Sequence, residues 1–222
     1  MAIQNQGHEY EFEPQYGLPE RLPVDEQILW QGSPDTKALA MSAFHMRKLF
    51  IYFLLLTVAC AWPAIETGAG PWAMLLAVKL IVPLTVVAMV SVWILALMTA
   101  RTTVYTLTNK RVVMRLGIVL TVTFNLPLKR ISAADVREIS GGFGDISLAL
   151  TGEDRIAWVH LWPSVRPWRI KKTEPTLRAV PDARAVAVQL RDAWSHATGL
   201  PAVAVQTVGS GRDARAFQVS PT

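Results

Sequence analysis

The sequence predicts an α+β membrane protein, built from a transmembrane hairpin of two helices and a cytoplasmic antiparallel β domain that a C-terminal helix caps. Two long apolar runs lie in the first half of the chain, short alternating segments follow them, and one amphipathic segment comes last. We therefore expect an acidic N-terminal segment (residues 1–36), a hairpin region (37–100), a β domain (101–198) and a flexible tail (199–222).

The two apolar runs span about residues 49–65 and 80–98, and neither contains a charged side chain. At about 1.5 Å per residue, the second run covers roughly 28 Å, the thickness of a bilayer's hydrocarbon core, and the first covers roughly 25 Å. Arg47 precedes the first run and Arg101 follows the second, whereas the connecting turn carries Glu66 and no cation. By the positive-inside rule, we expect a multi-pass inner-membrane protein with both termini in the cytoplasm.

Segments that alternate apolar and polar residues follow the second run, as half-buried strands do. They are 104–116, which turns at Asn109-Lys110, then 121–128, 145–150 and 156–162. We expect the last two to pair as a hairpin through a turn at 152–155. Short strands at this spacing are typical of a small antiparallel sandwich or barrel.

One amphipathic helix is predicted after these strands. Pro181 and Asp182 are typical of a helix start, and Gly199 is typical of its end. Its apolar face consists of Ala183, Val186, Leu190 and Trp194, at intervals of three and four residues. Strands first and one helix last is the order of a pleckstrin-homology-like barrel, in which the helix closes an open end.

Three stretches resemble known families. The hairpin "YTLTNKRVV", directly after two apolar runs, and the segment "GLPERLPVDEQILWQGSPD" before them are similar to bacterial pleckstrin-homology-like membrane proteins. The run "HLWPSVRPWRIKKTEPTLRAVPDA" closely resembles the PuhB family, the photosynthetic-complex assembly proteins of purple bacteria, and the resemblance extends from Tyr16 to about Ala197. It implies a non-enzymatic factor in the intracytoplasmic photosynthetic membrane. Its implied partners are reaction-centre subunits and the polypeptides of the core light-harvesting antenna.

The stretch "HLWPSVRPWRIKK" is the strongest candidate for a binding surface, because aromatic rings and cations lie close together there. Such side chains are enriched in interface hot spots and at the level of lipid headgroups. The candidate residues for binding a partner or a lipid are Trp162, Arg166, Trp168, Arg169, Lys171 and Lys172. The alternative is that the tryptophans cover the apolar edge of the barrel. Dividing the stretch between the two, we expect Trp158 and Trp162 in the core, and Trp168 and the cations that follow it exposed.

Lys79 is the one charge in the second apolar segment, and it stands just before the run 80–98. At the bilayer centre a lysine would cost about 3 kcal/mol, but at the outer edge its amine can reach the headgroups. We expect Lys79 to anchor the span, and a contact with a partner is the alternative.

The net charge of +5 is unevenly distributed. Acidic residues predominate before Lys37, whereas lysine and arginine predominate from Arg101 to Val180. A basic domain beside a membrane attracts anionic lipid headgroups, at about 1 kcal/mol per near-surface cation. We expect no nucleic-acid partner, because no nucleic-acid motif accompanies the charge. A membrane-anchored module that binds anionic lipid, or an accessory subunit of another membrane complex, is the alternative function, and a homo-oligomer is left open.

No residue pattern predicts catalysis, a metal or a cofactor. The four histidines are scattered and lack metal-ligand spacing with Cys, Asp or Glu. Gly141, Gly142 and Gly144 lead into a strand instead of a helix, which favours a plain loop over a phosphate site. His45, at the edge of the first run, is the nearest candidate for a chlorophyll ligand, and a solvated interfacial histidine is the favoured interpretation. The lone Cys60 lies within that run and is interpreted as a packing residue.

Overall fold

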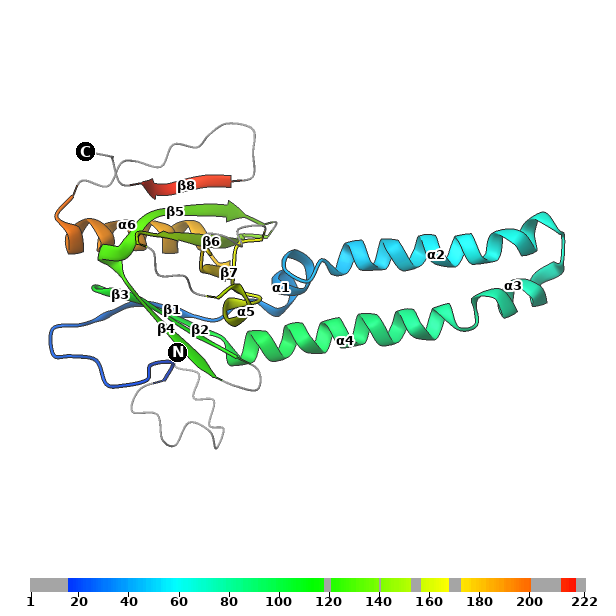
Figure 1. Cartoon of the computed structure of the whole chain (residues 1–222), viewed down its shortest axis with the longest axis horizontal. Helices are drawn as coiled ribbons and strands as arrows, with labels where there is room; N and C mark the ends of the chain where they lie inside the picture. The colour runs from blue at the N-terminus through cyan, green and yellow to red at the C-terminus, as the bar shows by residue number, and fades with distance from the viewer. Residues whose placement is uncertain are drawn as a thin grey trace. The chain divides into compact units, whose positions relative to one another are not determined.

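The computed structural model describes most of the chain. The described residues are 16–117, 121–139, 141–152, 157–167, 173–200 and 213–218. Residues 36–98 form one compact unit, and residues 1–35 together with 99–222 form a second. We call the first the helical unit and the second the β unit, and Figure 1 labels the elements of both.

The helical unit contains helices joined by short turns. They are α1 (Thr36–Ser42), α2 (Met46–Glu66), α3 (Gly70–Val78) and α4 (Ile81–Thr102), whose last turn belongs to the β unit. Helices α2 and α4 are long and apolar enough to cross a membrane, with mean hydropathies of 1.9 and 2.5 in their apolar stretches. Only 11% and 6% of those stretches are buried. Their side chains therefore suit a lipid environment better than a water-exposed surface.

The prediction of two long apolar helices is confirmed. The run 49–65 lies within α2, and the run 80–98 lies almost entirely within α4, which begins at Ile81. Lys79 is exposed and follows α3 directly, so it precedes α4 as the sequence indicates.

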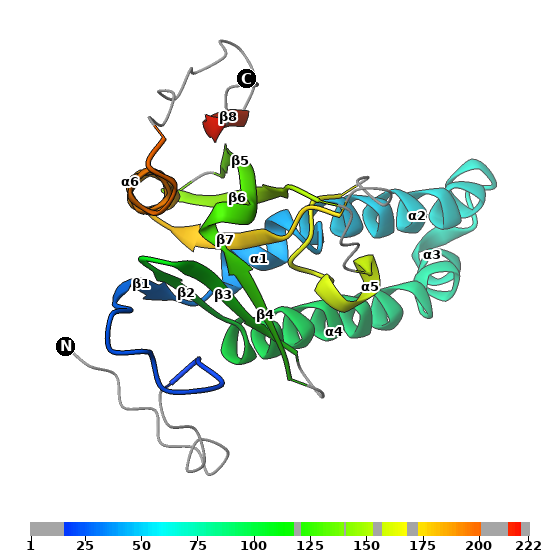
Figure 2. The ribbon, with the colours of Figure 1, turned by 60° about the vertical axis from the view of Figure 1, so that its left-hand side comes forward.

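The described residues of the β unit form two four-stranded antiparallel sheets. The first has the order β1-β2-β3-β4, with β1 (Ile28–Gly32), β2 (Val104–Thr108), β3 (Arg111–Leu116) and β4 (Val122–Pro127). The second has the order β7-β6-β5-β8, with β5 (Ile131–Glu138), β6 (Phe143–Leu150), β7 (Thr176–Pro181) and β8 (Asp213–Gln218). The short helices η2 (Leu128–Arg130) and α5 (Trp158–Leu161) lie in connections. Helix α6 (Ala183–Thr198) packs against η2, β5 and β6, and Figure 2 shows it end-on beside the sheets.

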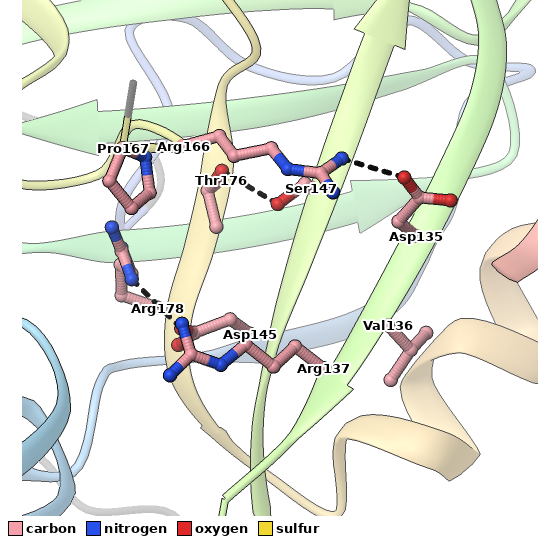
Figure 3. A pocket seen from close by; sticks show the side chains of 9 residues that line it. All are labelled: Asp135, Val136, Arg137, Asp145, Ser147, Arg166, Pro167, Thr176 and Arg178. Atoms are coloured by element: carbon pink, nitrogen blue, oxygen red, sulfur yellow. Dashed lines mark hydrogen bonds and ion pairs between the residues drawn. The ribbon is translucent and has the colours of Figure 1, made fainter. Parts of the chain in front are cut away.

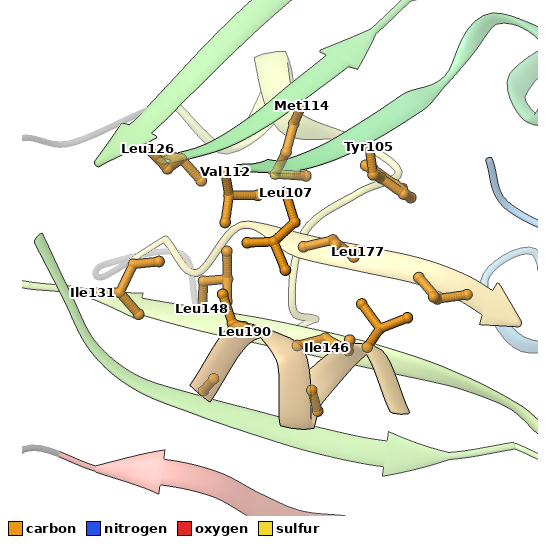
Figure 4. Packing of buried hydrophobic residues seen from close by; sticks show 14 of the residues in the cluster. Tyr105, Leu107, Val112, Met114, Leu126, Ile131, Ile146, Leu148, Leu177 and Leu190 are labelled. Atoms are coloured by element: carbon orange, nitrogen blue, oxygen red, sulfur yellow. The ribbon is translucent and has the colours of Figure 1, made fainter. Parts of the chain in front are cut away.

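Apolar side chains of both sheets and of α6 pack into a shared core (Figure 4). Those labelled are Tyr105, Leu107, Val112, Met114 and Leu126 of the first sheet, Ile131, Ile146, Leu148 and Leu177 of the second, and Leu190 of α6. Trp194 is the largest fully buried side chain, and its indole N–H donates to the carbonyl of Ile131 at 2.9 Å. Because the indole N–H has an acceptor, burial of the ring leaves no unsatisfied donor.

Several predicted elements are confirmed. The hairpin 104–116 turns at Asn109-Lys110 between β2 and β3, and the segment 121–128 supplies β4. The predicted helix is α6, and all four residues of its apolar face are buried. Gly199 ends it in the left-handed conformation, with a φ of 70°.

The glycine-rich stretch is a loop between β5 and β6, as the sequence indicates. Gly141 and Gly142 have φ values of 87° and 82°, which side chains rarely adopt. Gly144 serves a different purpose, because a Cβ atom there would lie 2.7 Å from that of Ala183. The absence of a side chain thus lets β6 approach the start of α6.

The predicted strand 156–162 is wrong. Residues Trp158–Leu161 form helix α5, and the two neighbours of β6 are β5 and β7. Both edges of β6 are therefore occupied, which excludes the predicted pairing of this segment with residues 145–150. The expectation of a core position for Trp162 is also wrong, because its side chain is 45% exposed, whereas Trp158 packs partly buried against the core.

The expectation of a flexible tail does not hold for residues 213–218, whose backbone forms β8 against β5. The sequence does not indicate strands β1, β5 and β7. The described part of β7 shows why, since Thr176–Val180 are all buried and a strand buried on both faces lacks alternation.

Candidate interaction surface

The residues just before β1 are fixed to the β2–β3 turn through a buried carboxylate. Glu26 is only 6% exposed. Its Oε1 accepts hydrogen bonds from Thr108 Oγ1 at 2.7 Å and from Arg111 Nε at 2.8 Å. The charge of Glu26 is therefore compensated by a cation and a hydroxyl, as a buried carboxylate requires.

The same turn is held by neighbouring residues. The backbone N–H of Gln27 donates to Asn109 Oδ1 at 3.0 Å, and the Asn109 N–H donates to the Gln27 carbonyl at 3.2 Å. Lys110 forms an exposed ion pair with Asp25, and this hydrogen bond lowers the pKa of Asp25. The segment before the apolar runs and the β2–β3 hairpin, which both resemble bacterial pleckstrin-homology-like membrane proteins, therefore contact each other. These contacts stabilise the β unit.

The candidate binding stretch is described as far as Pro167. Trp168, Arg169, Lys171 and Lys172 lie outside the described residues. Trp162 follows α5 and exposes 45% of its surface. The backbone from Pro163 to Arg166 then runs beside the start of β7, where Val165 bridges to Pro175.

Arg178 of β7 holds this stretch in place through hydrogen bonds of its guanidinium. Its guanidinium donates to the carbonyls of Val165 at 2.7 Å and Pro163 at 3.3 Å, and to Asp145 Oδ2 at 2.8 Å. Asp145 Oδ1 accepts from the backbone N–H of Ala179 at 2.9 Å. Arg178 and Asp145 are 6% and 2% exposed, so they form a buried ion pair. The other guanidinium N–H groups of Arg178 bind the loop at Pro163 and Val165.

Tyr105 completes this arrangement from the first sheet. Its hydroxyl lies 2.8 Å from Ser164 Oγ and accepts a hydrogen bond from the backbone N–H of Arg178 at 3.2 Å. Burial raises the pKa of Tyr105 to about 12. The neutral phenol therefore links both sheets to the loop at any physiological pH.

Arg166 is held by two carboxylates. Its Nη1 donates to Asp135 Oδ2 at 2.6 Å and to Glu174 Oε2 at 2.9 Å. Burial alone would lower the pKa of the Arg166 guanidinium, but the hydrogen bonds to both carboxylates outweigh burial and raise it. The structure thus places Arg166 in ion pairs within the β unit, with 27% of its side chain exposed.

These side chains surround a polar pocket of about 190 Å³, shown in Figure 3. It is lined by Asp135, Val136, Arg137, Asp145, Ser147, Arg166, Pro167, Thr176 and Arg178. Ser147 and Thr176 contribute hydroxyls 3.0 Å apart. Hence the pocket brings Arg166, which the sequence predicts as a binding residue, together with residues that the sequence does not predict to bind.

One signal in the sequence could have found Arg178. It interrupts an otherwise uncharged strand, "TLRAVP", and a buried arginine needs an acidic partner. Nothing in the sequence names Asp145 as that partner, because pairing of β6 with β7 brings the two together across 33 residues.

Among the described residues, no three His, Cys, Asp or Glu side chains form a group that could hold a metal ion. The carboxylates nearest the pocket are engaged by arginines, as described above. The arrangement can present side chains to a partner, and its hydrogen bonds hold the loop that carries Trp162.

The bacterial PH domain family matches residues 49–194, from α2 to the buried Trp194 of α6. The chain belongs to the bacterial PH domain family. A similar protein is the "uncharacterized 23.7 kDa protein in puhA 5′ region" of Rhodobacter capsulatus, which is 36% identical over 190 residues. That alignment covers 84% of this chain and 87% of the relative. Both findings agree with the resemblance to PuhB-type proteins. No solved structure matches the chain.

Proposed function

We propose that this bacterial PH domain protein is a non-enzymatic assembly factor for the photosynthetic reaction centre and the core light-harvesting complex. It binds assembly intermediates through its membrane hairpin and its cytoplasmic β unit. The observation that carries the proposal is the 36% identity, over most of both chains, to the protein of the puhA 5′ region. That relative and the PH-like domain fit an accessory protein of photosynthesis.

In this proposal, α2 and α4 cross the intracytoplasmic photosynthetic membrane. Their low burial supports it, because apolar helices that bury only 11% and 6% of their apolar stretches have side chains available for lipid and for other transmembrane helices. Both termini lie in the cytoplasm, as the flanking cations indicate. A reporter fused after Thr222 should read as cytoplasmic, and a periplasmic signal would contradict this topology.

The β unit then contacts the cytoplasmic side of the intermediate. Trp162 and the cations that follow Pro167 are the proposed contacts, with reaction-centre subunits, antenna polypeptides or anionic headgroups as partners. The exposure of Trp162 and the rigid support of its loop by Arg178 favour such a role. Lys79 is a further proposed contact or anchor at the opposite end of the span.

An assembly factor stabilises an intermediate only in proportion to its concentration relative to its dissociation constant. We therefore expect a deletion strain to accumulate less reaction-centre complex, while the complexes that do form keep normal chemistry. The test is to fractionate membranes by complex size and to quantify this chain in each fraction. It should accompany partly built complexes and be sub-stoichiometric in finished ones. Normal reaction-centre levels in the deletion strain would contradict the proposal.

The alternative is a module that binds anionic lipid without a protein partner. Binding of the purified chain to anionic but not zwitterionic liposomes, together with no co-purifying subunits from photosynthetic membranes, would favour this alternative.

A further inference from the structure

Lys79 stands at a break between two apolar helices. Helix α3 is apolar throughout, and only two residues separate its end from the start of α4. The whole stretch from Pro71 to Met98 holds one charge, that of Lys79. Pro83 explains the break, because it has no N–H to donate to the Lys79 carbonyl one turn earlier. The cation therefore interrupts an apolar stretch and does not stand at its edge.

The position of α3 beside α2 sets the depth of Lys79. Figures 1 and 2 show α3 next to the last turns of α2, and the two helices contact each other. Helix α2 has 21 residues, about 31 Å in length, which is enough to cross the hydrocarbon core by itself. With α2 across the membrane, α3 lies in the leaflet at the closed end of the hairpin (residues 67–69). The nine residues of α3 cover about 13 Å, so Lys79 lies about that far below the closed end.

The hairpin does not supply a counter-ion for Lys79. Glu66 is the only acidic residue between Thr36 and Arg101. It lies at the closed end, where its Oε1 accepts a hydrogen bond from Trp62 Nε1 at 2.7 Å. Lys79 is exposed and makes no ion pair within the described part of the chain. Because an unpaired lysine inside a bilayer is costly, its counter-ion has to come from another molecule.

Large apolar side chains lie near this cation. Leu80 and Trp72 are 74% and 71% exposed, more than any other large apolar side chain of the helical unit. Leu76 is also exposed, and it shares one face of α3 with Trp72. The side chain of Lys79 spans roughly half of the distance to the closed end, which leaves its ammonium group below the layer of lipid phosphates. A second transmembrane helix, in contrast, brings a carboxylate to this depth and covers the apolar side chains as well.

We propose that Lys79 and the break between α3 and α4 form a docking site inside the membrane for a transmembrane helix of a partner protein. The partner helix carries an aspartate or glutamate at the depth of Lys79. Its carboxylate pairs with the ammonium group, and its apolar face packs against Trp72, Leu76 and Leu80. The site rests on the proposed crossing of the membrane by α2 and α4, and it adds the chemistry of the partner to that proposal.

The test uses the full chain in phosphatidylcholine vesicles and dye-labelled synthetic transmembrane peptides made of leucine and alanine. One peptide carries a glutamate about nine residues from its end, to match the depth of Lys79, and its control carries a glutamine there. A third peptide carries its glutamate at the terminus. Energy transfer from the tryptophans of the chain to the dye measures binding. The wild-type chain should bind the first peptide about tenfold more tightly than either of the others.

Lys79→Met should abolish this difference, whereas Lys79→Arg should retain it because the guanidinium keeps the charge. Lys48→Met removes another exposed lysine of the helical unit and should leave the difference unchanged. Equal binding of the glutamate and glutamine peptides by the wild-type chain would overturn the site. Equally tight binding of the peptide with a terminal glutamate would also overturn it, and would assign Lys79 to the level of the lipid headgroups. Alkaline extraction of the vesicles tests the membrane crossing separately. Loss of the chain contradicts both the crossing and the site, whereas retention with equal binding contradicts the site alone.

Discussion

The helical unit and the β unit place their side chains in opposite ways. In the helical unit many apolar side chains are exposed, and Val90 of α4, for example, is 51% exposed. In the β unit the charged pair Arg178 and Asp145 is almost fully buried. Exposing apolar side chains to water is unfavourable, and so is burying an unpaired charge in an apolar core. The exposed apolar helices suit a lipid environment, and each buried charge compensates the other. The exposed apolar residues of one unit and the buried charged residues of the other therefore indicate the environment that suits each unit.

The largest expected effect comes from breaking the buried pair of the β unit. Arg178→Met leaves Asp145 buried without its cation, so we expect the free energy of unfolding to fall by about 3–5 kcal/mol. Urea unfolding of the full chain in detergent, followed by tryptophan fluorescence, measures the loss. The control Arg191→Met removes an exposed ion pair with Asp192 and should cost less than about 1 kcal/mol. Equal losses in both variants would show that burial of the pair is unimportant.

The next effect tests the helical unit. Val90→Arg puts a charge near the middle of α4, and insertion into the bilayer should become less favourable by about 3 kcal/mol. We expect a smaller fraction of the chain to resist alkaline extraction from membranes. Val188→Arg is the matched control, because Val188 is an exposed valine of α6, at 39%. If both variants remain equally in the membrane, α4 is not a membrane span.

A smaller effect comes from the hydroxyl that joins the sheets. Tyr105→Phe leaves the N–H of Arg178 without its acceptor and should cost about 1–2 kcal/mol of unfolding free energy. Burial raises the pKa of Tyr105 from 10.0 to about 12, so the neutral form is favoured in the folded state. The stability that this provides is complete below pH 10 and is lost as the pH rises from 10 towards 12. Unfolding measured across this range should show an extra decline in the wild type that Tyr105→Phe lacks.

The smallest effect on stability is expected at Trp162. Because its side chain is 45% exposed, Trp162→Ala should change the unfolding free energy by less than about 1 kcal/mol. The same substitution should nevertheless reduce recovery of this chain with partly built complexes. Trp194→Ala, which empties a fully buried site, should instead cost about 3–5 kcal/mol. A large loss of stability in Trp162→Ala would assign this ring to the fold instead of to a partner.

Predictions from the sequence succeeded where the signal is local. The apolar runs of α2 and α4, the turn at Asn109-Lys110 and the spacing of the α6 face depend on neighbouring residues only. Predictions failed where pairing decided the outcome. The segment 156–162 has the alternation of a strand, yet β5 and β7 occupy both edges of β6.

The candidate site divides in the same way. The sequence by itself located the apolar runs that become α2 and α4. It also selected the aromatic and basic stretch as a binding surface, and that selection stays a prediction. Only the tertiary structure decided that Arg166 is held by Asp135 and Glu174, and that Arg178 supports the loop from a neighbouring strand. The physical reason is that hydrophobic periodicity is set by the geometry of one helix or strand. An ion pair between residues far apart in the chain exists only once the register of the sheets is set.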